Sequence, residues 1–368
     1  MDQNSIALRR TAPGLLALAI LLLLGRPALA QGPPTPLMMP ESRAIDSDAP
    51  AQPLFDPPTG TGFAADEFTS DQEVRSFGEV LQESLVGPLR PDLWRPLTLD
   101  SFFSEGWDEQ YAPVPHDTPR QTWINNADGA FYRLYVFSFS DMVNIPGAVN
   151  DNGFNGSFFL FTPLNRRFEI GWFIPWATAS PSENRTIGRF GDVTIAPRFL
   201  LEETKQLTVT ANLYVRTPTG EPINGNGVTS FSPDLEFWAN PVDRWVVRGA
   251  AGFTVPLSYS GTKAALLAAN PWSGFNSNPG AFNSFDARLA IGKYITPADA
   301  PYFSNLVLEL SANLHTQVGG GHATYFSLTP GFRFGIGHEF YLLGGVEFPV
   351  VGPLPFTAQP IVQLIKNF

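Results

Sequence analysis

The stretch that most limits what this chain can fold into is Phe190–Thr217, where apolar and polar residues alternate in two successive runs. A period of two fits an extended strand with one apolar face, and it does not fit a helix. The polar residues Glu202–Lys205 separate the runs, which predicts a hairpin of two strands of about ten residues each. Strands of this length with a polar opposite face are typical of transmembrane β-barrels. The apolar positions of the second run are Leu207, Val209, Ala211, Leu213 and Val215.

The composition agrees with an all-β chain that contacts lipid. Of the 368 residues, 43% are hydrophobic and 13% aromatic, but only 15% are charged. A mean hydropathy near zero argues against a helical membrane protein with many spans. The net charge of −11 argues against nucleic acid as a partner, because phosphate binding needs a basic surface. The absence of cysteine from the sequence excludes disulfides, thiolate metal sites and cysteine nucleophiles.

The start of the chain predicts export. Arg9 and Arg10 precede the apolar run Leu15–Leu24, and Ala28–Ala30 has the small-x-small pattern of a cleavage site. We expect residues 1–30 to be a cleaved signal peptide, because this run is shorter than the about 20 residues of a membrane-spanning helix. Residues 31–69 are rich in Pro, Ala, Asp and Gly and are expected to form a disordered linker.

Residues 70–120 are expected to hold one short helix followed by an irregular periplasmic segment. A capping box at Ser70–Glu73 precedes apolar residues at helical spacing, and Gly87-Pro88 ends the pattern. This helix could act as a plug, contact a partner or dock at the barrel mouth. A small docked helix without a separate activity is the favoured interpretation. The apolar residues are Val74, Phe77, Leu81 and Leu85.

The alternating pattern recurs through residues 121–368 and predicts an antiparallel up-and-down barrel of about twelve strands, within a range of roughly 10 to 14. The first two candidates alternate weakly, and the others alternate clearly. The expected strands are Phe131–Ser140, Ser157–Pro163, Phe168–Trp176, Phe190–Leu201, Gln206–Thr217, Phe231–Phe237, Trp245–Val255, Phe285–Ile291, Leu306–His315, Phe326–Phe334, Phe340–Phe348 and Phe356–Phe368.

The lengths of the connections support this barrel and give it a direction. Bacterial barrels have short periplasmic turns and longer outer loops. The connections before odd-numbered strands are short, apart from the intermediate Thr296–Phe303, whereas most of the others are long, the longest being Ser258–Asn283. We therefore expect Glu202–Lys205 on the periplasmic side and Pro218–Val228 outside.

Aromatic residues mark the expected periplasmic rim, where rings favour the headgroup region. Trp238 and Trp245 flank one short turn, and Phe303 and Phe340 lie near others. The chain ends on Phe368 after an amphipathic strand. A terminal Phe of this kind resembles the membrane-insertion signal that the outer-membrane barrel assembly machinery recognises.

If the apolar side chains face lipid, charged residues of both signs line the lumen. A basic residue on the lipid face would cost about 2–4 kcal/mol at mid-membrane. It is therefore informative that the charged residues consistently share the face opposite the apolar one. The near balance of signs suggests ion pairs across a narrow lumen. These pairs could merely hold a small barrel together, or they could orient a solute. The expected lumen-lining residues are Asp192, Arg198, Arg216, Asp234, Glu236, Arg248, Asp286, Arg288, Glu309, Arg333 and Glu347.

Catalytic and metal-binding patterns are poor, so no catalytic residue, metal or cofactor is predicted. Asn313 and His315 share a face, but no serine stands in a nucleophile setting. We interpret His315 and His322 as polar loop residues rather than as a metal pair. The run starting at Asp151 departs from a calcium loop, since Gly153 occupies its third position and Thr162 its twelfth.

The opening hairpin also resembles a known family. The run Gly191–Phe199, the following strand and the Thr217–Gly220 loop resemble the outer-membrane barrel family labelled "MetA-pathway of phenol degradation". The resemblance covers residues 165–255 and is looser beyond them. It implies a barrel and uptake of small aromatic or hydrophobic solutes, and it implies no catalytic residues. The Arg120–Ile124 segment and the Pro-rich extension resemble additions in planctomycete envelope proteins.

The sequence thus predicts a bacterial outer-membrane channel that passes or binds small solutes, with outer-membrane lipid and a small-molecule solute as partners. A structural or adhesive barrel with a filled lumen is the alternative. A membrane-embedded hydrolase is the least favoured hypothesis.

Overall fold

The computed structural model describes residues 76–86, 95–107, 120, 122–126, 128–144, 152–180, 185–187, 190–220, 229–258, 283–318, 324–337, 339–352 and 354–368. The expected signal peptide and the linker of residues 31–69 lie outside these ranges. None of the described helices is long and apolar enough to cross a membrane.

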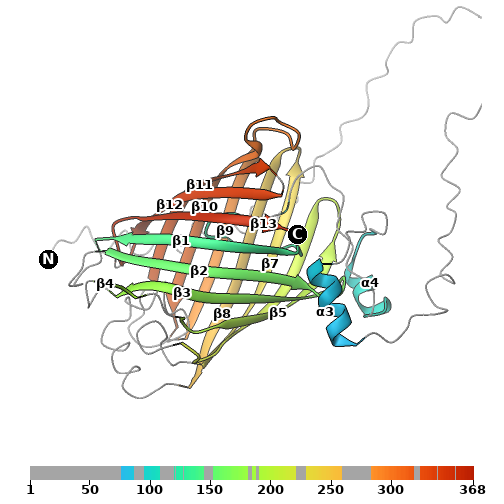
Figure 1. Ribbon diagram of the computed structural model, residues 1–368, viewed down its shortest axis with the longest axis horizontal. Helices are drawn as coiled ribbons and strands as arrows, with labels where there is room; N and C mark the ends of the chain where they lie inside the picture. Colours follow the sequence, from blue (N-terminus) through green and yellow to red (C-terminus); the bar gives the residue numbers. More distant parts are fainter. Residues whose placement is uncertain are drawn as a thin grey trace, which may run out of the picture. The chain divides into compact units, whose positions relative to one another are not determined.

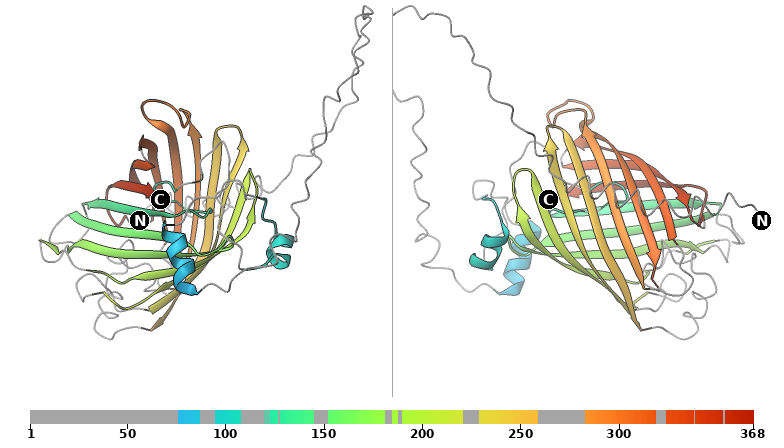
Figure 2. Two further views of the ribbon diagram at one scale, coloured as in Figure 1. Left: turned by 45° about the vertical axis from the view of Figure 1, so that its right-hand side comes forward. Right: turned by 180° about the vertical axis from the view of Figure 1, so that it is seen from behind.

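Twelve antiparallel strands form a closed ring (Figures 1 and 2), as the alternating pattern predicts. Each strand pairs with its neighbours along the chain, and β1 pairs with β13 to close the ring. The three-residue strand β4 (Arg185–Ile187) only extends the end of β3. The ring consists of β1 (Leu134–Val143), β2 (Asn152–Pro163), β3 (Phe168–Ser180), β5 (Thr194–Glu203), β6 (Leu207–Arg216), β7 (Thr229–Val242), β8 (Trp245–Ser258), β9 (Ser284–Tyr294), β10 (Ser304–Gln317), β11 (Thr324–Gly337), β12 (Phe340–Val351) and β13 (Gln359–Asn367).

The connections alternate as expected. Turns such as 164–167 and 243–244 gather at one end, here called the short-turn end, together with the start of β1 and the end of β13. The strand ends that the longer connections join lie at the other end, here called the loop end. The hairpin of β5 and β6 therefore turns at the short-turn end.

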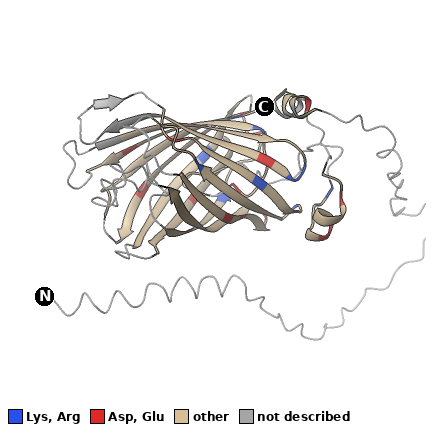
Figure 3. Ribbon diagram, turned by 90° about the horizontal axis from the view of Figure 1, so that it is seen from below, with Lys and Arg blue, Asp and Glu red and all other residues tan. Residues whose placement is uncertain are grey.

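The outer surface of the wall is mostly apolar, and most charged residues of the strands point inward. Leu235, Phe253, Leu308 and Phe348 are exposed on the outside, while the charged residues between them are interior. Figure 3 shows a largely uncharged wall with few acidic and basic positions. An apolar exterior around a charged interior is the pattern of a transmembrane barrel.

Two short helices precede the barrel. Helix α3 (Phe77–Val86) is the expected helix, and its described capping box is formed by Ser76 and Glu79. The capping box expected at Ser70–Glu73 lies outside the described residues. Helix α4 (Leu99–Ser104) lies in the segment that was expected to be irregular. Arg167, from the β2–β3 turn, donates to the Ser101 carbonyl at 2.9 Å and so fastens α4 to the wall.

Trp238 does not belong to the rim, contrary to the sequence prediction. Its side chain is fully buried inside the barrel, whereas Trp245 across the turn is exposed, with the Lys293 ammonium 5.3 Å from its ring. The inward parity of Ser230, Glu236 and Trp238 on β7 is kept to the end of the strand. The need to fill the lumen therefore decides the position of Trp238.

A charge on the outer wall tests the lipid-facing surface. Leu235 lies midway along β7 and is 56% exposed. Leu235→Arg is expected to lower the free energy of unfolding in lipid vesicles by about 2–4 kcal/mol, because a guanidinium at mid-membrane loses its hydration. The matched control is Tyr302→Arg at the short-turn end, where the expected cost is about 0–1 kcal/mol. Equal urea midpoints for the two variants would contradict a lipid-facing band.

Candidate functional site

The barrel interior contains part of the chain itself. Residues 120–133, here called the inner segment, precede β1 and run inside the ring at the short-turn end; residues 121 and 127 of this segment lie outside the described residues. Arg120 forms a buried ion pair with Glu203 at 3.2 Å and also donates to the Thr204 carbonyl. The segment is thereby fixed to the β5–β6 turn.

Polar contacts attach the inner segment to strands on the opposite wall. The Ile124 N–H donates to Glu309 at 2.8 Å, and the Ile124 carbonyl accepts from Ser311 at 3.1 Å. The Asn125 amide donates to Glu347 at 2.7 Å and to Thr329 at 3.2 Å. The segment therefore bridges β5, β10, β11 and β12 across the lumen.

An aromatic cluster fills the space beside these contacts. Trp123 packs against Trp238, Val246 and Val307 from three strands of the wall. The guanidinium of Arg248 lies 4.7 Å from the Trp123 ring, and that of Arg120 lies 4.6 Å from the Trp238 ring. Since all these side chains are almost completely buried, the short-turn end of the lumen is closed at this level.

Arg198 is the centre of a buried charge network on β5. It forms ion pairs with Glu169 and, at 3.2 Å, with Glu236, and its Nε donates to Asn212 at 3.0 Å. It also donates to the backbone carbonyl of Asp128 in the inner segment. Two carboxylates and two neutral acceptors thus satisfy one guanidinium that has no access to water.

Asp128 links this network to a second arginine. Its carboxylate lies 3.8 Å from Arg248. Burial raises the pKa of Asp128 to about 6, and the neighbouring cations Arg198 and Arg248 only partly oppose this shift. At this point the inner segment therefore contacts the wall through a buried carboxyl group, whose desolvation costs free energy, rather than through an apolar side chain.

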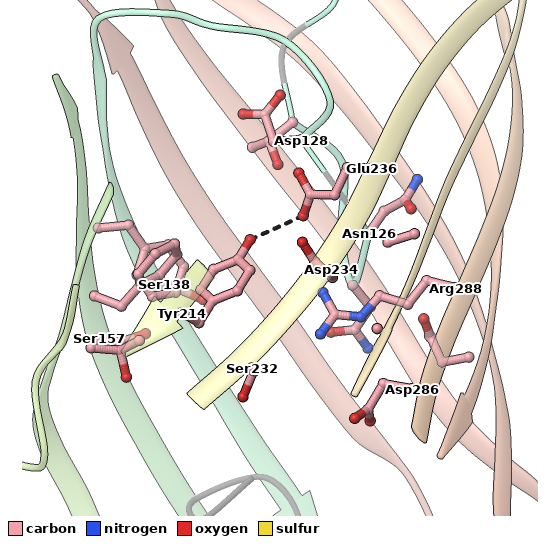
Figure 4. Close-up of a pocket in the computed structure, with 18 of the residues that line it drawn as sticks. Asn126, Asp128, Ser138, Ser157, Tyr214, Ser232, Asp234, Glu236, Asp286 and Arg288 are labelled. Atoms are coloured by element: carbon pink, nitrogen blue, oxygen red, sulfur yellow. Dashed lines mark hydrogen bonds between the residues drawn. The ribbon is translucent and has the colours of Figure 1, made fainter. Parts of the chain in front are cut away.

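Towards the loop end the interior opens into a cavity of about 540 Å³, here called the vestibule. Its floor includes Trp123, Asn125 and Asp128 of the inner segment. The side formed by β1, β2, β3 and β13 is uncharged and mixes apolar side chains with serine, asparagine and glutamine, while charged residues on β6 to β9 form another side. Figure 4 shows Tyr214, Asp234, Glu236, Asp286 and Arg288 around this space. The apolar residues of the uncharged side are Val136, Phe159, Phe161, Phe173, Pro175 and Ile361.

Residues 137–340, more than half of the chain, match the model of a protein family described as "Putative MetA-pathway of phenol degradation". The chain belongs to this family. The family resemblance seen in the hairpin is thereby confirmed. No curated protein sequence matches the chain.

Three solved structures of low sequence identity are similar to this chain. An outer-membrane channel from Pseudomonas putida F1 is 8% identical, with a TM-score of 0.48, over 67% of this chain and 99% of that one. The KdgM porin is 7% identical, with a TM-score of 0.40, over 64% and 99%. The NanC porin is 5% identical, with a TM-score of 0.41, over 64% and 99%.

The lumen-lining residues expected from the sequence lie at two levels along the barrel. One group lines the vestibule, and the other lies beside the inner segment at the closed level. Arg248 faces Trp123, Glu309 holds Ile124, and Arg333 lies over the Tyr341 ring at 4.0 Å. The vestibule group consists of Asp192, Arg198, Arg216, Asp234, Glu236, Asp286, Arg288 and Glu347.

Two of the vestibule arginines already have carboxylate partners. Arg216 pairs with Asp192 at 3.2 Å, near the loop end, and Arg198 pairs with Glu236 as described above. His315 lies 2.5 Å from Asp286, so its imidazole belongs to this polar wall. His322 lies outside the described residues. Among the described residues no three His, Asp or Glu side chains form a metal-binding group.

Sequence reasoning missed several interior residues, and some of them carried a usable signal. Glu169 alternates with Phe168 and Ile170 on β3, so parity alone places it inside. The inner segment carried no such signal in the sequence, because Arg120, Trp123 and Asn125 contact different strands and their spacing along the chain follows no regular period. Its position inside the lumen follows only from the structure of the closed barrel.

Proposed function

We propose that this protein is an outer-membrane channel of the MetA-pathway family that admits small solutes into the vestibule from the loop end. The observation that carries this proposal is the 540 Å³ interior cavity, which has a charged side and an uncharged side that contains several aromatic rings. A polar lumen inside an apolar wall is how barrels provide a path through lipid. No enzymatic activity is proposed for it.

Small aromatic or hydrophobic solutes fit the vestibule best. The family description refers to phenol degradation. Phe159 and Phe173 lie side by side on the uncharged side, with ring centroids 5.2 Å apart, and the Tyr214 ring centroid lies 5.5 Å from that of Phe173. An aromatic ring would bury apolar area against these side chains while polar groups faced the charged strands.

Export of the chain and insertion by the barrel assembly machinery, with Phe368 as the insertion signal, belong to the same proposal. Phe368 lies at the short-turn end, where its ring centroid is 5.9 Å from that of Tyr135. This position is the periplasmic rim in the proposed orientation.

The inner segment makes passage conditional. Because residues 120–133 close the short-turn end, a solute in the vestibule reaches the periplasm only when this segment moves. The filled end also favours the alternative, a structural or adhesive barrel without transport. Locking the segment in place separates these two functions.

A reversible lock is available because the natural chain contains no cysteine. The Asn125 amide and the Thr329 hydroxyl lie 3.2 Å apart, so N125C and T329C together place two thiols within reach of a short cross-linker or a disulfide. The oxidised double variant is expected to lose conductance in planar bilayers and solute-dependent swelling in liposomes. Reduction is expected to restore both.

The single variants N125C and T329C, treated with the same oxidant, are the controls and should conduct like the parent protein. Conductance that persists in the cross-linked double variant would show a path independent of the inner segment. Absence of both conductance and swelling in every form, including the unmodified protein, would favour the structural role.

A further inference from the structure

Helix α4 and the residues that follow it carry a cluster of exposed apolar side chains at the short-turn end. Leu99 is 51% exposed, Phe103 83% and Trp107 47%. Single exposed apolar residues are common on protein surfaces, but three large ones within nine positions of the chain form a patch. A patch of this kind marks a surface that contacts another apolar surface.

The helix itself is amphipathic. Successive residues of an α-helix turn by about 100°, so Leu99, Phe102 and Phe103 lie within an arc of about 100°. The other side of the helix is polar and consists of Asp100, Ser101 and Ser104. An amphipathic helix with aromatic residues on its apolar side is suited to lie in the plane of a membrane interface, with that side in lipid.

The backbone of α4 finds its hydrogen-bond partners within the protein. The last carbonyls of a helix have no partner inside the helix, and water usually supplies one. Here the buried guanidinium of Arg167 donates to the carbonyls of Ser101 at 2.9 Å and Glu105 at 2.5 Å. The Ser104 hydroxyl donates to the Asp100 carbonyl at 3.0 Å. Groups that border hydrocarbon need such internal partners, because lipid tails offer none.

The charge at the end of the helix is also neutralised within the protein. The Glu105 carboxylate forms ion pairs with three guanidinium groups, those of Arg95 at 3.4 Å, Arg166 at 3.6 Å and Arg167 at 3.0 Å. A carboxylate that is paired in this way tolerates the edge of an apolar phase far better than an isolated one. The same contacts fix α4 to the β2–β3 turn.

Trp107 places this segment on the outside of the barrel. Its ring centroid lies 6.2 Å from that of Phe199, with the two rings nearly perpendicular. On β5 Phe199 alternates with the buried residues Arg198 and Leu200, so its side chain faces outward. Trp107 therefore packs against the side of the wall that faces lipid.

The contact lies at a depth where lipid is present. Strand β5 has ten residues, and at a rise of about 3.3 Å and a tilt of about 40° it spans about 25 Å, the height of the apolar band. Phe199 precedes the end of the strand, Glu203, by four residues, which is about 10 Å along the barrel axis. Trp107 thus reaches the edge of the band from the short-turn end, where tryptophan is favoured.

A continuous series of aromatic rings joins the wall to the exposed tip of α4. The ring centroids of Phe168 and Phe199, both on the wall, lie 5.1 Å apart. From Trp107 the series continues to Phe102 at 5.3 Å and from there to Phe103 at 5.2 Å. The apolar side of α4 is therefore an extension of the surface that the barrel presents to lipid.

We propose that residues 98–107, here called the anchor segment, bind the membrane beside the barrel. Leu99, Phe103 and Trp107 enter the boundary between headgroups and acyl chains of the leaflet at the short-turn end, and the polar side of α4 faces the headgroups and water. The partner is the bilayer itself, because the apolar side continues the lipid-facing wall. This role requires the wall to lie in lipid, and it does not require the barrel to conduct.

The absence of cysteine from the sequence allows a test with single labelled cysteines. F103C and S104C place a fluorophore on opposite sides of the same helix in the full chain, reconstituted in phosphatidylcholine vesicles. Nitroxide-labelled phosphatidylcholine is expected to quench F103C at least about threefold more strongly than S104C, and aqueous iodide should show the reverse order. L99C shares the apolar side and is expected to behave like F103C.

Two reference positions calibrate the quenching. L235C, on the outer wall, reports lipid, and D243C, in an exposed turn at the short-turn end, reports whether iodide reaches that end. If iodide quenches F103C as strongly as S104C and D243C, the apolar side faces water, as a surface for a soluble protein would, and the anchor is refuted. Protection of F103C from both quenchers would show packing against the barrel and would refute it as well.

The same measurement separates the anchor from the other proposals. Lipid quenching at L235C without quenching at F103C would refute the anchor and keep the barrel in the membrane. Absence of lipid quenching at both positions would refute the lipid-facing wall and the anchor together. Because no conductance is measured, the channel function is tested independently.

Discussion

Replacing Gly129 by valine is expected to raise the open probability of the channel more than any other single change in the inner segment. An added Cβ at this position would lie 2.7 Å from the backbone carbon of Phe237 and 2.9 Å from the backbone nitrogen of Trp238. Neither atom can move without distorting β7, so the inner segment must move away from this strand. Overpacking of this kind costs about 1–3 kcal/mol. The ratio of molecules with the inner segment in place to molecules with it displaced should therefore fall about 5- to 150-fold.

The measurement is single-channel recording in planar bilayers, with the heat-dependent electrophoretic shift as proof of an intact barrel. Gly78→Val in helix α3 is the matched control, because the nearest atom to its added Cβ is 4.0 Å away, and it should conduct like the parent protein. If G129V keeps the parent conductance while its barrel is folded, the inner segment does not close the path.

Replacing Arg198 by methionine is expected to cause the largest loss of stability. The change leaves Glu169 and Glu236 buried without their cation, and it removes the donor to the Asp128 carbonyl. Breaking a buried charge pair by removing one partner costs about 3–5 kcal/mol. Arg198→Lys should recover only part of this loss, since an ammonium cannot reproduce the forked geometry of the guanidinium.

Urea unfolding in detergent, followed by tryptophan fluorescence, measures this loss. The matched control is Arg244→Gln, because Arg244 pairs with Asp243 at 3.8 Å on the exposed surface. Exposed pairs contribute about 0–1 kcal/mol, so this variant should unfold close to the parent midpoint. Similar midpoints for R198M and R244Q would show that the buried network contributes no more than a surface pair.

Local alternation was enough to predict the wall of the barrel. Along β6 the apolar residues Leu207 to Val215 face outward and the polar ones face inward, because a strand exposes successive side chains to opposite sides. The same rule would have placed Glu169 and Trp238 inside. Trp238 lies next to a turn, but it shares the inward parity of Glu236 and is therefore buried.

The two levels of the lumen could not be predicted in this way. Asp234, Gly252 and Asp286 share a row only because hydrogen-bond register aligns three strands, and register depends on turns and bulges as well as on pattern. The sequence therefore predicted inward charges without predicting which of them pair and which remain open.

By itself the sequence determined the strands and which face of each strand is apolar, since these follow from residues a few positions apart. Only the tertiary structure decided that residues 120–133 close one end of the lumen. Asn125 meets Glu347, which lies 222 residues further along the chain, and Arg120 meets Glu203. Contacts of this range form only once the ring closes and encloses the segment, and they leave no periodic trace in the chain.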